Sequence, residues 1–287
     1  MSAATQAAAA DASREREFDF SDADFNALRD LVKRLAGITL ADSKREMVYG
    51  RVSRRLRTLA LRSFGEYRRK LEADDAELVE FCNAMTTNLT AFYRENHHFE
   101  YMRNQFLLPR LNDARGSRRI RIWSAACSSG EEAYSIAMTV CEAIPDCKRW
   151  DIKILATDID SEILARARRG IYTEDRVKGI DPRRIKRFFR EHDDGRQRTY
   201  EVNAQIADMI TFKPLNLMHE LPMKGPLDAI MCRNVIIYFD KEAQRGLFQR
   251  IARAQRPNDL LFLGHSESLF KVSDDYELIG RTIYRRI

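Results

Sequence analysis

The run from Ile120 to Ser135 constrains the fold of this chain more than any other part of it. It begins with alternating apolar and polar residues, passes through a loop of small residues that ends at Gly130, and continues with the spacing of an amphipathic helix. A strand, a tight loop and a helix in this order are typical of a doubly wound α/β sheet, in which this turn binds part of a nucleotide-like ligand.

Two adjacent carboxylates, Glu131 and Glu132, stand at the start of the predicted helix. A helix N-terminus attracts phosphate, but two carboxylates there would repel a pyrophosphate and attract an ammonium or sulfonium group. A cationic adenosyl ligand, S-adenosylmethionine, therefore fits this turn better than NAD, FAD or ATP, and the loop lacks the Gly-Lys-Ser/Thr ending of a P-loop. The two glutamates are explained equally well as acids that complement a helix N-terminus, so the run alone leaves both interpretations open.

Composition describes a globular chain without a membrane-spanning segment. The 287 residues are 44% hydrophobic and 32% charged, which suits one large or two ordinary domains. No apolar run approaches the roughly 20 residues that cross a bilayer, and the Ala-rich start, Met1–Ser13, lacks the features of a secretory signal. We predict a disordered tail over residues 1–17 and a monomeric, cytoplasmic protein that does not insert into a membrane.

Cysteines, histidines and net charge narrow the chemistry. The five cysteines form no C-x-x-C pair, which indicates reduced thiols rather than a disulfide framework or a zinc site. His97 and His98 are adjacent and point in different directions, so we expect no metal. A net charge of +6 and a pI near 9.1 indicate an acidic partner, and charge does not decide between nucleic acid, membrane and protein.

Residues 18–90 are predicted to form a small helical domain, because Gly and Pro are rare there and no strand alternation occurs. The start and stop signals are polar caps and a glycine. The predicted helices run from Ser21 or Asp22 to near Gly37, from Asp42 or Ser43 to about Leu61, around Phe64–Leu71 and around Ala76–Met85.

The second helix of this domain carries a basic arc beside an apolar one. Acidic residues are almost missing from the basic arc, which favours docking on an acidic surface over a merely solvated face. The residues that we predict to dock on a partner are Lys44, Arg51, Arg54, Arg55 and Arg62.

Residues 118–287 alternate strands with helices, which predicts a parallel, doubly wound sheet, and residues 91–117 form a helical connector. A closing hairpin that turns at Gly280-Arg281 adds an antiparallel edge. Residues 171–215 are too long for one crossover, and we interpret them as an inserted subdomain with a small antiparallel sheet. The main predicted strands are 119–125, 152–157, 227–232 and 258–263, and the helices are 131–143, 161–169 and 240–255; within the insert we predict a basic helix over 182–190 and strands near 199–202 and 209–212.

Two further segments are predicted to meet the loop at the carboxyl end of the sheet, where ligands of open α/β sheets bind. Asp158 ends the second strand, at a position where an acid binds ribose hydroxyls, while Asp160 or Ser161 caps the next helix. Arg233-Asn234 follow a buried apolar strand, where two polar side chains are hard to explain by packing. The convergence favours the ribose role for Asp158 over that of a simple strand end.

Five sequence blocks stand in order along the chain: residues 86–95 (TTNLTAFYRE), 123–132 (WSAAC to GEE), 157–160 (TDID), 232–239 (CRNVIIYF) and 264–267 (GHSE). With these blocks the chain resembles the CheR family of chemotaxis receptor methyltransferases, the S-adenosylmethionine-dependent protein-glutamate O-methyltransferases, from about residue 20 to residue 287. Two departures, Ser129 where Thr is usual and Ala133 where Pro is usual, remove no polar ligand contact.

The resemblance implies an enzyme that transfers a methyl group from S-adenosylmethionine to glutamate side chains of chemoreceptors for sensory adaptation, and releases S-adenosylhomocysteine. It also implies that the helical domain docks on the receptor's methylation helices. In some relatives the β-subdomain binds a receptor C-terminal peptide, and residues 191–202 leave open whether this chain does so. The residues that the resemblance assigns to the cofactor site are Asn88, Thr90, Arg94, Glu132, Asp158, Asn216, Leu217, Arg233 and Asn234.

Methyl transfer to a carboxylate needs no general base, because the acid is already ionised near neutral pH. The chain has to align the oxygen, methyl and sulfur atoms and exclude water. From their motif positions we expect Arg94 to orient the substrate carboxylate and Tyr238 to help position it. The alternative for Arg94 is a cofactor contact only.

Two other functions fit parts of the sequence. A nucleic-acid methyltransferase would use the basic charge and stack bases on Tyr238-Phe239, but the basic residues cluster on a separate helix, so we expect no nucleic-acid partner. An adaptor that senses S-adenosylmethionine without catalysis is less favoured, because the set of site residues is complete.

Overall fold

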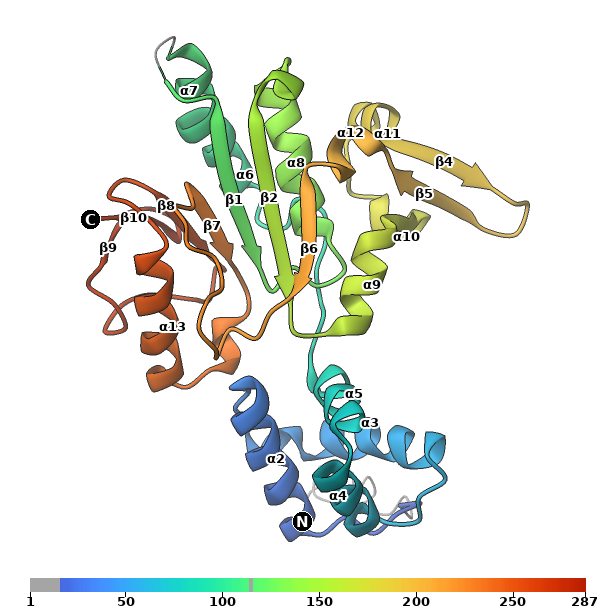
Figure 1. Cartoon of the computed structure of the whole chain (residues 1–287). Coiled ribbons are helices and arrows are strands. Elements are labelled where there is room, and N and C mark those ends of the chain that lie inside the picture. The colour runs from blue at the N-terminus through green and yellow to red at the C-terminus, as the bar shows by residue number, and fades with distance from the viewer. Residues whose placement is uncertain (1–15, 114–115) are drawn as a thin grey trace, which may run out of the picture. The chain divides into compact units, whose positions relative to one another are not determined.

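The computed structural model describes residues 16–113 and 116–287, so the predicted tail over 1–17 lies outside the described residues except for its last two. The chain divides into two compact units (Figure 1). One, the helical unit, runs up to Lys33 and from Leu40 to Met85; the other, the α/β unit, comprises residues 34–39 and 86–287. The division after Met85 falls a few residues before the predicted boundary at residue 90.

The helical unit is built from the four predicted helices. Its second helix ends three residues earlier than predicted, because Ala60 takes a left-handed conformation (φ 53°) without a glycine to announce it. The Leu61 N–H then donates to the Leu56 carbonyl (2.9 Å) and the Ala60 N–H to the Arg57 carbonyl (3.2 Å), the hydrogen bonds of a Schellman cap. The helices are α2 (Asp22–Ala36), a short 3-10 turn η1 (Asp42–Lys44), α3 (Arg45–Thr58), α4 (Phe64–Ala73) and α5 (Asp75–Met85).

A buried ion pair crosses the interior of the helical unit. Arg55 Nη2 lies 2.6 Å from Glu77 Oε2, and the Tyr67 hydroxyl donates to the other oxygen of Glu77 (2.8 Å). Glu77 is only 4% exposed. Arg55 therefore faces the interior, and its predicted place in a docking surface needs correction. Arg51 donates to the Ala84 carbonyl (3.1 Å).

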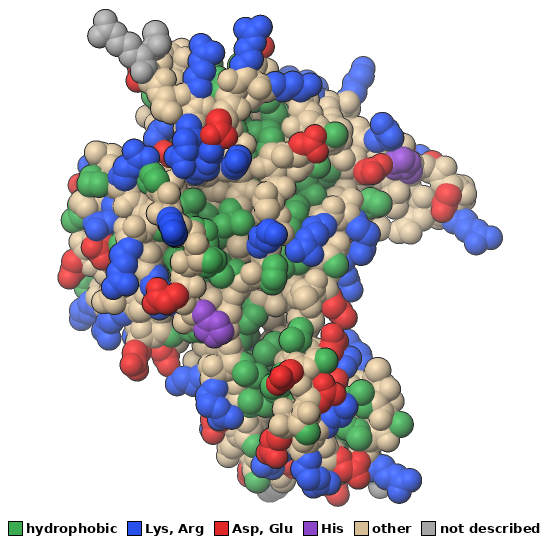
Figure 2. Space-filling view, in the orientation of Figure 1, with side chains coloured by type: hydrophobic (Ala, Val, Ile, Leu, Met, Phe, Trp, Pro, Cys, Tyr) green, Lys and Arg blue, Asp and Glu red, His purple; other side chains and the backbone are tan. Residues whose placement is uncertain are grey.

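Lys44, Arg54 and Arg62, the other residues of the predicted basic arc, are exposed. On the face shown in Figure 2, acidic and basic side chains are intermingled over the helical unit. The exposed part of the basic arc is therefore smaller than the sequence predicted.

The α/β unit is organised around a mainly parallel sheet with a closing hairpin, as predicted, and this sheet has seven strands, one more than predicted. The five strands from β6 to β8 are parallel, and in the closing hairpin β10 is antiparallel to both β8 and β9 (Figure 1). In spatial order the strands are β6 (Ile210–Pro214), β2 (Asp151–Asp158), β1 (Arg119–Ala125), β7 (Ala229–Cys232), β8 (Leu260–Leu263), β10 (Ile283–Arg286) and β9 (Tyr276–Gly280).

Helices cover both faces of this sheet, because side chains of a strand point alternately to its two sides. Ile120 and Ile122 of β1 belong to the core that includes α8 (Glu131–Ala143) and the helical segment 97–112. Trp123 and Ala125 belong to the other core, with α13 (Lys241–Arg253). The segment 97–112 consists of α6 (His97–Tyr101), the π-helical η2 (Met102–Leu107) and α7 (Leu108–Asn112). No helix among the described residues is long and apolar enough to cross a membrane.

The insert follows α9 (Ser161–Arg169) and differs from the prediction in two ways. The run near 209–212 is β6, which pairs in parallel with β2 at the edge of the main sheet, so the insert ends before Ile210 rather than at residue 215. The predicted basic helix over 182–190 ends at Phe188 and continues directly into a strand. The small antiparallel sheet has the order β3 (Ile171–Thr173), β5 (Arg198–Val202), β4 (Phe189–Asp193), and its helices are α10 (Glu174–Val177), α11 (Pro182–Phe188) and α12 (Ala204–Ala207).

Candidate active site

The carboxyl ends of β1, β2 and β7 meet at one edge of the main sheet. Ala125 of β1 is in register with Thr157 of β2 on one side and with Cys232 of β7 on the other. The loop 126–130, Asp158 and the Arg233-Asn234 pair therefore lie at the same edge, as the alternation of strands and helices predicted.

In the loop after β1, every second residue has a left-handed backbone conformation. Ala126 (φ 60°), Ser128 (φ 51°) and Gly130 (φ 94°) all have positive φ. At Gly130 a Cβ atom would lie 3.0 Å from the Ala167 Cβ and 3.1 Å from the Tyr172 hydroxyl, so the position admits only glycine without displacement.

Asp158 closes β2 and is 5% exposed. Its carboxylate accepts hydrogen bonds from the N–H groups of Ser128 (2.8 Å) and Asp160 (3.0 Å). Burial raises the pKa of Asp158 to about 6. Each carboxylate oxygen has two lone pairs, so the group retains acceptor capacity for hydroxyl donors. Asp160 accepts from the N–H groups of Glu162 and Ile163 and caps α9, as one of the two predicted alternatives.

The two glutamates at the start of α8 have different partners. Glu131 is fully buried and forms an ion pair with Arg176 of the insert. The prediction that both glutamates face a cationic ligand is therefore wrong for Glu131, whose charge Arg176 neutralises. Glu132 accepts from the Ser124 hydroxyl (2.7 Å) and from Arg233 Nη1 (2.9 Å), and burial raises its pKa.

An irregular segment, residues 86–96, crosses the edge from β2 to β7. At the β2 end, the Asn88 amide donates to Asp160 Oδ2 (2.7 Å), and the Ser128 hydroxyl donates to the Asn88 carbonyl (3.1 Å). Further along, the Tyr93 N–H donates to the Ser135 hydroxyl (3.0 Å). Thr90 is half-buried between these anchors. Periodicity carried no signal for this segment, and only the resemblance identified it.

Arg94 lies where the segment reaches β7. Its guanidinium donates to the Leu89 carbonyl (2.9 Å), and its own carbonyl accepts a hydrogen bond from Arg233 Nη2. Arg233 is buried between Glu132 and Glu95 (Nη2–Oε2 3.4 Å). Its Nε–H is buried and has no hydrogen-bond partner within the described residues.

Asn234, with φ 57°, opens the loop that leads to Tyr238. Its amide donates to Glu95 Oε1 (3.2 Å). Glu267, which the sequence did not mark as functional, accepts from the N–H groups of Asn234 (2.8 Å), Val235, Ile236 and Gly264 and so holds this loop in place. Tyr238 is half-buried in this loop, and its carbonyl accepts from the Thr39 N–H (2.8 Å).

Asn216 and Leu217 follow β6, whose last residue, Pro214, is in register with Asp158. The Asn216 amide donates to the Leu35 carbonyl (2.6 Å) and its oxygen accepts from the Met218 N–H (3.0 Å). The Leu217 carbonyl accepts from Arg250 (2.6 Å). All the residues that the resemblance assigned to the cofactor site lie on segments at this edge of the sheet.

These residues fit an adenosyl cation. A buried acid, Asp158, stands where ribose hydroxyls bind in such sheets. A buried donor on Arg233 lacks a partner within the described residues, and Arg233 pairs with two carboxylates, Glu95 and Glu132. No cluster of His, Cys, Asp and Glu in the described part of the chain is arranged to hold a metal ion. The five cysteines are all buried and free.

Comparisons with known proteins identify the family of this chain. Residues 88–285 match the family described as CheR methyltransferase, SAM binding domain, and residues 23–86 match CheR methyltransferase, all-alpha domain. The chain is 42% identical to a chemotaxis protein methyltransferase of Escherichia coli over 92% of this chain and 91% of that one. It is also 42% identical to chemotaxis protein methyltransferase 2 of Pseudomonas aeruginosa, over 94% and 95%.

A solved O-methyltransferase family structure from Burkholderia thailandensis matches 67% of this chain and 42% of its own at 15% identity, with a TM-score of 0.35 that is too low to add to the assignment. Fold and site define an S-adenosylmethionine-dependent methyltransferase. The family matches are decisive for the rest: the chain belongs to the CheR methyltransferase family.

Proposed function

We propose that this enzyme methylates glutamate side-chain carboxylates on the cytoplasmic methylation helices of chemoreceptors, giving glutamate methyl esters and S-adenosylhomocysteine. The observation that carries the proposal is the match to chemotaxis protein methyltransferases over nine-tenths of the chain. The proposal includes a cytoplasmic location, because the reaction takes place on the receptors' cytoplasmic helices. It also includes a monomeric enzyme.

The reaction needs positioning rather than acid–base catalysis. A glutamate acceptor is ionised near neutral pH and is already a nucleophile. When bound, S-adenosylmethionine supplies a methyl group activated by its sulfonium charge. The residues of the sheet edge have to hold the acceptor oxygen in line with that methyl group and exclude water, and such alignment is worth roughly 7–11 kcal/mol of barrier.

Arg94 is proposed to orient the acceptor carboxylate. A guanidinium has five N–H donors, and one nitrogen of Arg94 is used on the Leu89 carbonyl. The backbone of Arg94 is held by Arg233, so the remaining donors project from a fixed point. Tyr238, in the loop that Glu267 organises, is proposed to position the acceptor beside the methyl group.

The cofactor contacts are proposed to be divided along the edge. Asp158 binds the ribose hydroxyls, while the neighbouring Asn216-Leu217 pair borders the adenosine. Arg233 and Asn234 contact the amino-acid part of the cofactor. The other proposed contacts, on the crossing segment and at the start of α8, are Asn88, Thr90, Arg94 and Glu132.

Docking on the receptor is proposed to use the exposed part of the basic arc, Lys44, Arg54 and Arg62, with Arg51 at its border. Methylation helices that present several glutamates are acidic, and exposed cations attract them over a distance set by salt screening. Arg55 is left out of this surface because it pairs with Glu77 inside the helical unit.

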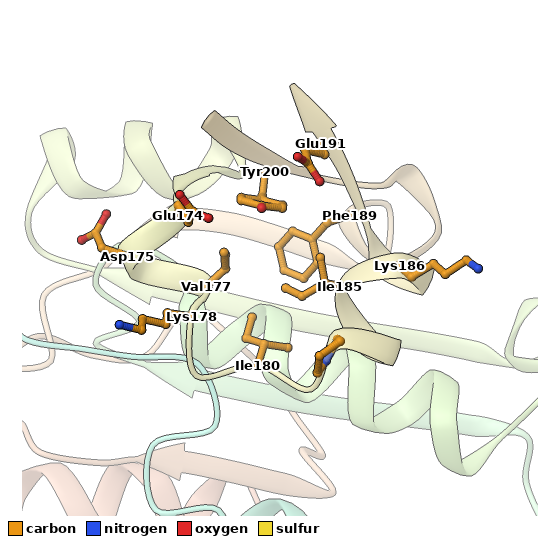
Figure 3. A pocket seen from close by; sticks show the side chains of 11 residues that line it. Glu174, Asp175, Val177, Lys178, Ile180, Ile185, Lys186, Phe189, Glu191 and Tyr200 are labelled. Carbon is orange, nitrogen blue, oxygen red and sulfur yellow. The ribbon is translucent and has the colours of Figure 1, made fainter. Parts of the chain in front are cut away.

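A second contact with the receptor is proposed at the insert. A hollow of about 750 Å³ is bordered by side chains of α10, α11 and the small sheet, including Val177, Ile185, Phe189 and Tyr200 (Figure 3). β4 is an edge strand of that sheet. A receptor's C-terminal peptide is proposed to add to this edge by strand pairing, with an apolar side chain in the hollow.

The test is incubation of the enzyme with labelled S-adenosylmethionine, chemoreceptor cytoplasmic fragments and RNA in one reaction. We expect base-labile label on the receptor fragments, since glutamate methyl esters hydrolyse in base. Label on RNA would identify a nucleic-acid methyltransferase, and binding of the donor without transfer would identify an adaptor. A receptor fragment with its methylated glutamates changed to alanine is the control.

A further inference from the structure

The loop after β7, residues 234–239, carries Tyr238 and has little regular structure of its own. It contains a single 3-10 turn, η4 (Ile236–Tyr238), and the hydrogen bonds of such turns have poorer geometry than those of an α-helix. The side chain of Ile236 is buried, whereas that of Ile237 is 53% exposed, so apolar packing holds only part of the loop. The position of Tyr238 therefore depends on groups outside the loop.

A buried carboxylate holds the N–H side of this loop. Glu267 is 5% exposed, and its two oxygens accept hydrogen bonds of 2.6–2.9 Å from four backbone N–H groups. A Cβ atom on Gly264 would lie 2.8 Å from Glu267 Oε2 and 2.8 Å from the Asn234 nitrogen, so only glycine leaves room for this approach. The four donors belong to Asn234, Val235, Ile236 and Gly264.

A buried amide holds the carbonyl side of the same loop. Gln244, on α13, is 7% exposed, and its Nε2 donates to the carbonyls of Ile236 (2.9 Å) and Phe239 (3.0 Å). Its oxygen accepts from Lys241 Nζ (3.2 Å). These partners fix the orientation of the amide, because only its nitrogen can donate to two carbonyls. The two carbonyls lie on either side of Tyr238.

We propose that Gln244 and Glu267 form a backbone clamp that holds Tyr238 in position for the acceptor. Ile236 is gripped on both sides, its N–H by Glu267 and its carbonyl by Gln244. The inference rests on the proposed function, in which Tyr238 positions the acceptor carboxylate. Both members of the clamp are positioning residues, since they act through the backbone, and a displacement of about 1 Å at such a site can cost about 100-fold in rate.

A merely structural role for Gln244 makes a different prediction, and Gln255 provides the matched comparison. Gln255 is 8% exposed, its Nε2 donates to the Leu260 carbonyl (2.9 Å), and its oxygen accepts from the Tyr276 hydroxyl (2.8 Å). Leu260 is the first residue of β8, so this amide lies at the amino edge of the sheet, opposite the site. If Gln244 only satisfied buried carbonyls, the loss of either glutamine would lower stability and leave the rate unchanged.

The experiment replaces each glutamine by methionine, which has a similar size and no N–H donor, in the full chain. For Gln244→Met we expect the methylation rate of receptor fragments, with donor and acceptor saturating, to fall about tenfold or more. Its donor affinity by calorimetry should change less than about twofold, because the two carbonyls lie beyond Asn234. Gln255→Met should lose at least as much stability in urea and keep its rate within about twofold of the parent.

Glu267→Gln tests the other side of the clamp and serves if Gln244→Met does not fold. Its amide nitrogen would face N–H groups and lose two of the four hydrogen bonds, so the rate should fall here too. Hydrogen exchange of residues 233–240, followed by mass spectrometry, gives a measurement without an acceptor. We expect faster exchange in Gln244→Met and Glu267→Gln, and parental exchange in Gln255→Met.

Three results would overturn the clamp: a parental rate in Gln244→Met, an equal loss of rate in Gln255→Met, or a donor affinity that falls in proportion to the rate. Equal exchange of residues 233–240 in the two glutamine variants would also overturn it. Failure of the proposed function would appear elsewhere, as a parent enzyme that does not methylate receptor fragments.

Discussion

Arginines play opposite parts in the two units of this chain. At the edge of the main sheet, Arg233 and Arg176 lie against buried carboxylates, and Arg233 also donates to the Arg94 carbonyl and so holds the backbone of the site. Among the described residues of the helical unit, Arg55 lies against a carboxylate that is almost fully buried, Glu77, and Arg54, one position before it, is exposed. The comparison teaches that burial of the partner, rather than the density of basic residues along the sequence, separates arginines that build geometry from those that are free to bind another molecule.

Buried and exposed arginines also differ in the free energy that is lost when they are replaced. Removing one member of a buried ion pair leaves an uncompensated charge and costs about 3–5 kcal/mol, whereas an exposed charge usually contributes within about 0.5 kcal/mol. Exposed charges instead govern association rates, in a way that salt screens. Of the four predictions, which run from the largest expected effect to the smallest, the first and the fourth test this division directly, and the second and third test the site that the buried groups build.

The first prediction compares two neighbouring arginines. Arg55→Glu places a negative charge beside the buried Glu77 and should lower the free energy of unfolding by about 3 kcal/mol or more. Arg54→Glu, one position away, should change it by less than about 0.5 kcal/mol. Urea denaturation of both variants measures the two free energies of unfolding. Equal values would mean that the Arg55–Glu77 pair does not contribute to stability.

The second prediction concerns Arg94. Arg94→Ala removes the donors proposed to orient the acceptor and should lower the methylation rate at saturating donor about 100-fold, a typical loss for a positioning group. Its donor affinity, from calorimetry, should fall much less. If the affinity falls and the rate with saturating donor is unchanged, Arg94 is a cofactor contact only.

The third prediction uses the pKa of Asp158, which burial raises to about 6. As the pH falls through 6, the carboxylate takes up a proton and loses acceptor capacity, so donor affinity should drop by up to about tenfold per pH unit. Asp158→Asn should bind weakly and lose this dependence. Calorimetry from pH 5 to 8 checks both, and a flat profile in the parent contradicts the ribose assignment.

The same shift has a consequence for stability, opposite in sign to that of an acid in an ion pair. Between about pH 4 and 6 the folded chain holds a proton on Asp158 that the unfolded chain has released. The contribution of Asp158 to the free energy of unfolding therefore falls as pH rises through this window and stays lost above it.

The fourth and smallest effect is expected at the surface. Arg54→Glu combined with Arg62→Glu should slow receptor methylation several-fold at low salt, through weaker attraction to acidic helices. The gap to the parent should narrow as salt increases, while donor affinity stays unchanged. Initial rates at two salt concentrations measure it, and identical rates at low salt would remove the docking surface from consideration.

The main sheet was predictable because its signals are local. The strand 119–125 alternates apolar and polar residues, strands such as 227–232 are apolar runs, and the helices beside them have a 3.6-residue period; glycine or aspartate marks several of their ends. β4 was missed because it follows α11 at Phe189 with no Gly or Pro between them. We predicted β6 in the small sheet of the insert, whereas it belongs to the main sheet. A short strand has the same sequence pattern in either sheet, and that pattern does not specify the strand with which it pairs.

Site residues could be predicted from the sequence only where a polar or charged residue directly follows a buried strand. Asp158 and Arg233 could be proposed from position alone, since both follow buried strands. The roles of Glu95 and Glu267 could not be proposed from the sequence, because the role of a carboxylate depends on which groups it contacts in the folded chain. Asn234, which Glu95 binds, lies 139 positions further along the chain. Arg55 was wrongly placed in the docking surface for a related reason. The helical arc was predicted correctly, but it gave no information about Glu77, the buried acid with which Arg55 pairs.

The root of the insert has a consequence for how such enzymes diversify. The Tyr172 hydroxyl donates to the Ser129 carbonyl (2.7 Å) and Arg176 grips Glu131, so the first residues after α9 are part of the cofactor loop's support. The Val202 N–H closes the other end on the Gly170 carbonyl (2.9 Å). Exchange of the stretch between Arg176 and Val202 leaves both anchors intact, so evolution or an engineer can change the receptor specificity of the insert there. A replacement that begins at Ile171 would also remove residues that support the cofactor loop.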